Sequence, residues 1–487
     1  MHGHTVEKIG GTSMSRVDAV FDNILIGKRD DASLYERIFI VSAYGGMTDL
    51  LLEHKKSGDA GVFSLFSEGE QAWMWSDALT RVAERMCEKN AEMFSDEDAL
   101  HSADQFIRER IEGARSCLLD LQRLCSYGHF QLEQHLLTVR EMLAAIGEAH
   151  SAFNTALLLR ERGVNALFVD LTGWRDEALL PLDEKIATAF ADIDLATTMP
   201  IVPGYAKCEE GMIKLFDRGY SEITMARIGV ITGAREAIIH KEYHLSSADP
   251  KVVGAERVAP IGRTNYDVAD QLSNLGMEAI HPRAAKGLRQ NGIALRIKNT
   301  FEPEHGGTLI DGDYRSSEPC VEIIAGRKSV IAVEVFDQDM VGASGYDTEI
   351  LALMDRFRIP VVTKDVNANT ITHYVDASLK KVKRLTRLLE ERYPSAMVAV
   401  RRVALVSAIG SDLDVPGLLA RCVRELSRAD ISILAVHQNM RAVDIQFLIE
   451  SGDYERAVCA LHECVIEKQN GNEARSKSES DRLMDVA

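Results

Sequence analysis

Two short glycine-containing stretches decide the fold: Lys8-Ile9-Gly10-Gly11-Thr12-Ser13 and Ser42-Ala43-Tyr44-Gly45-Gly46-Met47-Thr48. Each follows a short apolar segment, and the second of these segments, Arg37–Val41, is typical of a buried parallel strand. Glycines let backbone N–H groups approach an anion closely, and Lys8 adds a point charge. One GG pair alone is more often a tight turn. Two such loops at successive strand ends favour a phosphate-binding edge of a parallel sheet.

Two common nucleotide-binding patterns are absent from the sequence. No G-x-x-x-x-G-K-S/T stretch occurs, which excludes a standard P-loop, and no G-x-G-x-x-G stretch follows a strand to suggest a dinucleotide fold. The two glycine loops therefore predict a different kind of phosphate site.

The pattern around these loops predicts an α/β fold over residues 1–312. Short apolar strands alternate with helices, which favours a mostly parallel sheet covered by helices on both faces. A long helical stretch runs from about residue 68 to residue 159. The expected strands are 166–170, 201–203 and 236–239, and the expected helices include 17–26, 222–231 and 269–275.

The C-terminal third has a different pattern, which predicts two small α+β modules of about 70 residues each. We expect the first at 326–396 and the second at 401–468, with 313–325 as a candidate first strand of the second. Residues 469–487 are rich in Ser, Glu and Lys, and we expect a disordered tail.

The composition restricts the partners. The 487 residues include 56 basic and 74 acidic side chains, which gives a net charge of −18. Such a charge argues against nucleic acid or an anionic membrane as a partner. We expect no targeting signal, because the first twelve residues contain no apolar run, and no apolar run in the sequence is long enough to cross a bilayer. Eight scattered cysteines without a CxxC pair favour buried thiols in a reducing cytoplasm, and no metal site is expected.

At this point the motifs resemble those of the aspartokinases, over nearly the whole chain. KIGGTS resembles the KFGGTS signature that opens this family, and VSAYGGMTDLL resembles its second loop. The two C-terminal modules look like the paired ACT domains of the family. The other matching segments are Gly147-Glu148 with Ser151, Gly204-Tyr205, Arg218–Glu222, Ala248-Asp249-Pro250, Gly276 through His281-Pro282, and Lys298-Asn299-Thr300 with Gly307-Thr308.

The resemblance implies an amino-acid-kinase fold and direct attack of the β-carboxylate of aspartate on the γ-phosphorus of MgATP. Catalysis is then mainly positioning and charge neutralisation. Lys8 would bridge the β-carboxylate and the transferring phosphoryl group. Gly10, Gly11 and Gly45 would supply backbone donors to the phosphates.

The resemblance also implies how L-aspartate would be held. Ser42 and Thr48 would hold aspartate or phosphate oxygens, and Arg218 could bind the α-carboxylate through two hydrogen bonds. Glu148 would receive the α-ammonium group. Alone, Arg218 and Glu148 would be interpreted as a surface Arg and an ordinary helix-start Glu.

The sequence departs from the family pattern at three places. Glu222 replaces an Asp that would be a second ligand of the substrate ammonium, and we place Glu222 in both the substrate and the catalytic set. The nucleotide segment reads HKEYHLSSADP instead of roughly WTDVDGIYTADP, so Lys241 and Lys251 are the candidate phosphate-side cations there. Glu278 stands where the family often has a Lys. The whole pattern is most similar to aspartokinases associated with making the compatible solute ectoine.

An amino-acid effector is expected at the ACT-like modules, with Met340, Gly342 and Ser344 in the candidate loop before a helix. A plain strand–helix turn is an equal alternative. The family also implies a homodimer or higher homo-oligomer. Two other functions stay open: a kinase of another amino-acid carboxylate, such as glutamate, and a non-catalytic amino-acid sensor on the same scaffold.

Overall fold

The computed structural model describes residues 3–29, 31–54, 57–69, 71–216, 219–277 and 279–467. These residues form two compact units. The first contains the described residues up to 244 together with 280–312, and the second contains 245–279 together with the described residues from 313 onward. The domain boundaries expected from the sequence stay a prediction.

The first unit is built on a mostly parallel sheet with the strand order β3-β4-β2-β1-β5-β7-β8. β1 lies in the middle and pairs in parallel with both β2 and β5, whereas β8 pairs antiparallel with β7. All five residues of β2 are buried, as the continuous apolar run RIFIV predicts for a strand covered on both faces. The strands are β1 (Thr5–Ile9), β2 (Arg37–Val41), β3 (Ala166–Phe168), β4 (Met199–Pro203), β5 (Glu236–Lys241), β7 (Ala294–Asn299) and β8 (Thr308–Asp311).

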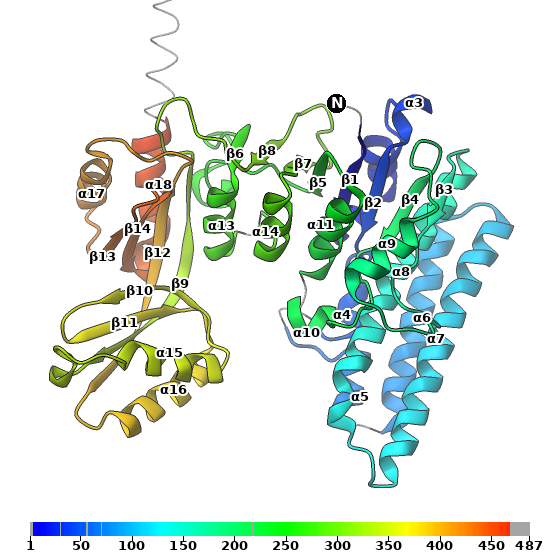
Figure 1. Cartoon of the computed structure of the whole chain (residues 1–487), viewed down its shortest axis with the longest axis horizontal. Coiled ribbons are helices and arrows are strands. Elements are labelled where there is room, and N and C mark those ends of the chain that lie inside the picture. The colour runs from blue at the N-terminus through cyan, green and yellow to red at the C-terminus, as the bar shows by residue number, and fades with distance from the viewer. Residues whose placement is uncertain are drawn as a thin grey trace, which may run out of the picture. The chain divides into compact units, whose positions relative to one another are not determined.

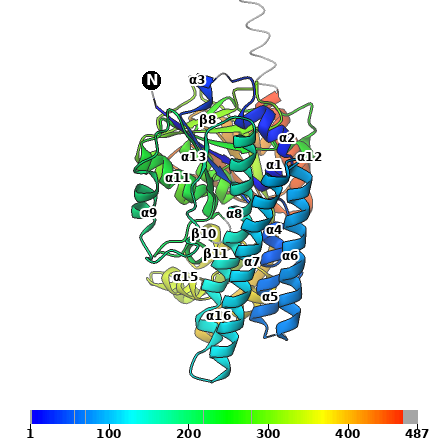
Figure 2. The ribbon, with the colours of Figure 1, turned by 90° about the vertical axis from the view of Figure 1, so that its right-hand side faces the viewer.

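Helices flank this sheet, and three long ones lie side by side in both views (Figures 1 and 2). They are α6 (Ala72–Met93), α7 (Glu97–Ser126) and α8 (Leu136–Glu161). α8 is buried around most of its circumference in its second half, as its nearly continuous apolar sequence requires. The remaining helices are α1 (Gly11–Met14), α2 (Val17–Val20) with a π-helical turn (Phe21–Leu25), α3 (Asp31–Leu34), α4 (Met47–Leu51), α5 (Val62–Ser67), α9 (Leu182–Phe190), α10 (Met212–Phe216), α11 (Tyr220–Thr232) and α14 (Pro282–Gln290).

The second unit contains a six-stranded antiparallel sheet with the order β10-β11-β9-β12-β14-β13. Two long strands, β9 (Ile323–Phe336) and β12 (Met397–Ile409), pair along most of their length and are shared by two α+β modules. One apolar core includes residues of α15 and α16, and another includes residues of α17 and α18. The other elements are α12 (Pro250–Val253), β6 (Arg263–Asn265), α13 (Tyr266–Asn274), α15 (Tyr346–Arg356), β10 (Val361–Val366), β11 (Thr370–Val375), α16 (Leu379–Arg392), α17 (Leu418–Arg428), β13 (Ile433–Gln438), β14 (Asp444–Glu450) and α18 (Tyr454–His462).

The fold class expected from the sequence is confirmed: a parallel α/β sheet with helices is followed by two ACT-like α+β modules. In the described part of the chain, no helix combines the length and the apolar character that a membrane span needs.

Candidate active site

The two glycine loops lie against each other because β1 and β2 are parallel neighbours whose carboxyl ends meet. A side chain at Gly11 would come within 2.7 Å of the carbonyl oxygen of Ala43, so only glycine allows this approach. The Gly45 N–H donates to Ser15 Oγ (2.9 Å), and the Gly10 N–H donates to the carbonyl of His240 (3.4 Å). To accept hydrogen bonds from these two N–H groups, a phosphate would have to displace Ser15 Oγ and the His240 carbonyl.

Lys8 projects from the end of β1 toward α11, where its Nζ lies 3.7 Å from Glu222 Oε1. Both side chains are largely buried, with 13% and 14% of their surfaces exposed. The other carboxylate oxygen of Glu222 accepts the backbone N–H of His281 (2.5 Å). Glu222 therefore neutralises and orients Lys8 from the first turn of α11, where a carboxylate is also favoured by the helix dipole.

Glu148 is a buried carboxylate on α8 that forms no salt bridge with the described residues. Its Oε1 accepts a hydrogen bond from Ser221 Oγ (3.0 Å), and its Oε2 has no hydrogen-bond partner. A side chain at Gly204 would lie 3.0 Å from that same Oε2, so glycine leaves the space beside the carboxylate free. Burial raises the pKa of Glu148 to about 8, although Ser221, Lys8 and the Tyr205 backbone oppose this shift. An unpaired oxygen in such a site is suited to a ligand ammonium group.

This raised pKa predicts a pH-dependent affinity for the amino-acid substrate. Only the ionised form of Glu148 attracts an ammonium group, and that form becomes dominant as the pH rises through about 8. We expect the KM for aspartate to fall between about pH 6.5 and about pH 9, and we expect Glu148→Gln to have a high KM without this dependence. The exposed Glu161 at the end of the same helix gives a matched control, Glu161→Gln, which should keep the wild-type profile. A Glu148→Gln profile equal to wild type would remove Glu148 from the site.

Ser42 and Thr48 lie on the second glycine loop and at the start of α4. The Ser42 carbonyl accepts a hydrogen bond from Ser151 Oγ on α8 (2.8 Å), which ties this loop to the helix that carries Glu148. Within the described chain, neither the Ser42 hydroxyl nor the Thr48 hydroxyl has a hydrogen-bond partner, so both are available to a ligand.

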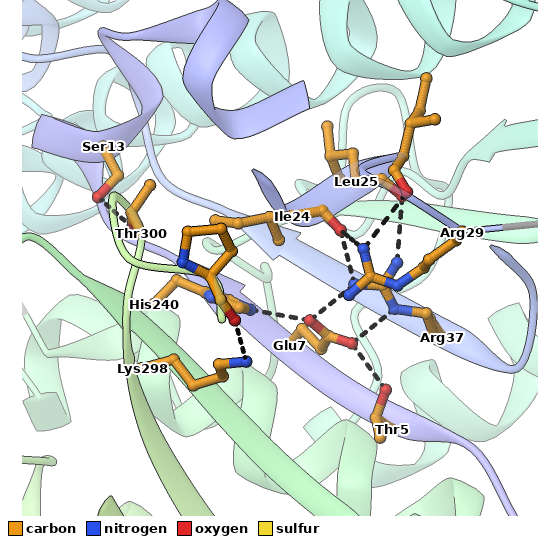
Figure 3. A network of polar contacts seen from close by, with 12 residues as sticks. Thr5, Glu7, Ser13, Ile24, Leu25, Arg29, Arg37, His240, Lys298 and Thr300 are labelled. Atoms are coloured by element: carbon orange, nitrogen blue, oxygen red, sulfur yellow. Dashed lines mark hydrogen bonds and ion pairs between the residues drawn. The ribbon is translucent and has the colours of Figure 1, made fainter. Parts of the chain in front are cut away.

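On the nucleotide side, the sequence did not single out Glu242. This carboxylate follows β5 and accepts a hydrogen bond from Ser13 Oγ of the first glycine loop (3.1 Å). Ser13 Oγ also lies 3.0 Å from Thr300 Oγ1, a contact visible in Figure 3. Lys241, which the sequence makes a candidate phosphate ligand, is the last residue of β5. No sequence signal locates Glu242, because its position depends on the parallel pairing of β1 with β5, which brings the two strand ends together.

A buried ion network holds the strand that carries Lys8 (Figure 3). Glu7 accepts hydrogen bonds from Arg37 Nε (2.7 Å), Arg37 Nη2 (3.0 Å), Thr5 Oγ1 (2.9 Å) and His240 Nε2 (2.8 Å). Arg37 also donates to the carbonyls of Ile24 and Leu25. Burial alone would raise the pKa of Glu7, but Arg37 and His240 hold it well below its usual range. The network joins β1, β2 and β5 beneath the glycine loops.

Several predicted residues are not brought to this site. Arg218 and Glu278 lie outside the described residues. Lys251 lies on α12 in the second unit, so its phosphate role stays a prediction. In the effector loop, Gly342 and Ser344 are exposed, whereas the Met340 side chain packs in the core of its module.

Comparison with known proteins agrees with this architecture. The amino acid kinase family matches residues 4–299, and an ACT domain matches residues 398–463. The chain is 60% identical to "Aspartate kinase Ask_Ect" of Stutzerimonas stutzeri over 467 residues, covering 96% of this chain and 98% of that protein.

Two solved structures of E. coli aspartokinase III share the fold. One, in complex with lysine and aspartate, has a TM-score of 0.69 at 18% identity and covers 95% of this chain and 99% of its own. The other, in complex with aspartate and ADP, has a TM-score of 0.67 at 20% identity and covers 94% and 99%. The chain belongs to the amino acid kinase family and, within it, to the aspartate kinases.

Proposed function

We propose that this protein transfers the γ-phosphate of ATP to the β-carboxylate of L-aspartate, giving ADP and 4-phospho-L-aspartate. The observation that carries the proposal is the buried carboxylate of Glu148, with one unpaired oxygen, beside Lys8 and two glycine loops. The 60% identity to a protein named as an aspartate kinase supports the same activity.

In this proposal, each charge of the substrate meets an opposite charge of the protein. Glu148 receives the α-ammonium, Arg218 binds the α-carboxylate, and Ser42 and Thr48 bind the β-carboxylate by hydrogen bonds. Lys8 draws the β-carboxylate and the γ-phosphate together by neutralising part of their charge. Glu222 keeps Lys8 in place through the 3.7 Å ion pair.

We also propose that Glu242, with Ser13, binds the magnesium ion of MgATP. A carboxylate and a hydroxyl beside the first glycine loop are oxygen ligands of the kind Mg²⁺ prefers, and the nucleotide phosphates would complete its coordination. When bound, the ion would neutralise phosphate charge.

The Glu242 assignment predicts a specific defect in metal dependence. We expect Glu242→Gln to raise the Mg²⁺ concentration for half-maximal activity by about tenfold, because one anionic ligand is lost. The KM for aspartate should stay near its wild-type value. The control is Glu302→Gln, because Glu302 lies after β7 with an exposed carboxylate and pairs with His244. An unchanged Mg²⁺ requirement in Glu242→Gln would contradict the assignment.

One assay separates the proposed activity from its alternatives. The purified chain is incubated with MgATP, hydroxylamine and one acceptor: L-aspartate, L-glutamate or N-acetyl-L-aspartate. We expect hydroxamate only with L-aspartate, because the acetyl group removes the charge that Glu148 needs. Preferred use of glutamate would favour a glutamate-type kinase. Aspartate binding without hydroxamate would favour the sensor.

The pathway, the regulation, the location and the oligomeric state of the protein are also part of the proposal. The HKEYHLSSADP segment and the relative Ask_Ect support a role in ectoine synthesis. An amino-acid effector at the loop of Gly342 and Ser344, a cytoplasmic location and a homo-oligomeric state are proposed from the family resemblance.

A further inference from the structure

A cavity lies in the first unit between α7, α8 and the loops around residues 173 and 206. Its volume is about 390 Å³, which is within the range of small-molecule sites. None of the residues assigned above to aspartate or ATP lines it. On α8, its wall includes Glu141 and Ala145, which precede Glu148 by two turns and one turn.

Part of the cavity wall is apolar. Trp174 lines the cavity together with three apolar residues of α8, Met142, Ala145 and Ile146. The Trp174 ring packs so closely on α7 that a side chain at Gly113 would come within 2.5 Å of it. Arg110 lies over this ring at 4.8 Å, donates to Thr172 Oγ1 (2.9 Å) and pairs with Asp170, so its charge is compensated.

Besides the Arg110–Asp170 pair, three charged side chains line the cavity: the anion Glu141 and the cations Arg175 and Lys207. Glu141 accepts hydrogen bonds from the backbone N–H of Ile213 (3.0 Å) and from the Tyr205 hydroxyl, but it has no cationic partner among the described residues. Arg175 and Lys207 likewise have no carboxylate partner in the described part of the chain. Arg175 also holds a left-handed backbone conformation (φ 61°), which costs free energy in a non-glycine residue. Charged groups of both signs that lack an ion-pair partner, around an apolar wall, match a zwitterion with an apolar side chain.

We propose that this cavity binds a free α-amino acid with an apolar side chain, separately from aspartate. Glu141 receives its ammonium group, Lys207 and Arg175 bind its carboxylate, and Trp174 and Met142 pack against its side chain. Tyr205 connects the two sites, because it lines this cavity and its backbone N–H contacts the Glu148 carboxylate. Binding should therefore change the affinity for aspartate.

The test uses L-phenylalanine and two analogues that each lack one charge, phenethylamine and 3-phenylpropanoate. Binding to the full-length protein is measured by calorimetry, without and with saturating aspartate. We expect L-phenylalanine to bind in both conditions and each analogue to bind at least about tenfold more weakly, since each lacks one charge-assisted contact.

Two substitutions locate the binding. Lys207→Met removes the charge and keeps an unbranched side chain, and it should weaken L-phenylalanine binding about tenfold or more. Lys214→Met removes an exposed lysine of α10 that does not line the cavity, and it should leave binding unchanged. Absence of binding, displacement of L-phenylalanine by aspartate, or equal affinities of the two variants would each overturn the proposal. Equal affinities would place the ligand elsewhere, for example at the ACT-like modules.

Discussion

Lys8→Ala should lower kcat by about 10³-fold while the protein stays folded. Lys8 lies near the end of β1, next to the first glycine loop, and its ammonium is 3.7 Å from the Glu222 carboxylate. Without this ammonium group, less of the repulsion between the aspartate carboxylate and the triphosphate would be neutralised. A loss of about 10³-fold corresponds to about 4 kcal/mol of transition-state stabilisation.

The matched control is Lys28→Ala. Lys28 is 91% exposed and pairs with Glu304 on the surface of the same unit, so its loss should leave kcat near wild type. Circular dichroism and thermal melting of both variants check the fold. Activity of Lys8→Ala within about threefold of the control would mean that Lys8 is not in the catalytic machinery.

Arg37→Met should destabilise the first unit by about 3–5 kcal/mol, because it leaves the Glu7 carboxylate buried without its cationic partner. Only 4% of the Glu7 side chain and 7% of the Arg37 side chain are exposed, so water cannot replace the lost contacts. The two main-chain carbonyls that Arg37 binds at the π-helical turn also lose their donor.

Urea unfolding followed by tryptophan fluorescence measures this effect selectively, because Trp73, Trp75 and Trp174 all lie in the first unit. Arg227→Met is the control, since Arg227 pairs with Asp183 at an exposed position and should contribute at most about 1 kcal/mol. The double variant Glu7→Gln with Arg37→Met should recover part of the loss. Equal stability of Arg37→Met and Arg227→Met would contradict the structural role of the network.

The network also has a predictable pH dependence. The folded-state pKa of Glu7 lies below its unfolded value, so its stabilising contribution is present above the unfolded pKa and is lost as the pH falls through the folded pKa. As the pH is lowered, the difference in the free energy of unfolding between wild type and Glu7→Gln should therefore become smaller.

Much of the fold was predictable because local patterns and tertiary structure agree. The strand at Arg37–Val41 has the bounds that the sequence predicts. The length of β9 and β12, the two strands shared by the ACT-like modules, was harder to predict, because it depends on the pairing of these strands with each other. Polar residues such as Arg401 and Arg402 interrupt the apolar run there.

The site was only partly predictable for a similar reason. Lys8, Glu148 and Glu222 lie in motifs with a recognisable pattern, and the structure places Lys8 beside Glu222. The position of Glu242 depends on the parallel pairing of β1 with β5, two strands more than 200 residues apart. Arg37 and Glu7 look like isolated charges in apolar strands, and only the sheet shows that they are partners.

The central claim is that a β-carboxylate oxygen of aspartate forms the new bond to the transferred phosphorus. L-aspartate labelled with ¹⁸O in its β-carboxylate, with MgATP and hydroxylamine, tests this claim. Hydroxylamine attacks the acyl carbon of 4-phospho-L-aspartate and releases phosphate that retains the bridging oxygen. We predict that the released phosphate carries one ¹⁸O atom, detected by mass spectrometry, and that Lys8→Ala releases almost none. Phosphate without ¹⁸O would show transfer to water and would contradict the proposed reaction.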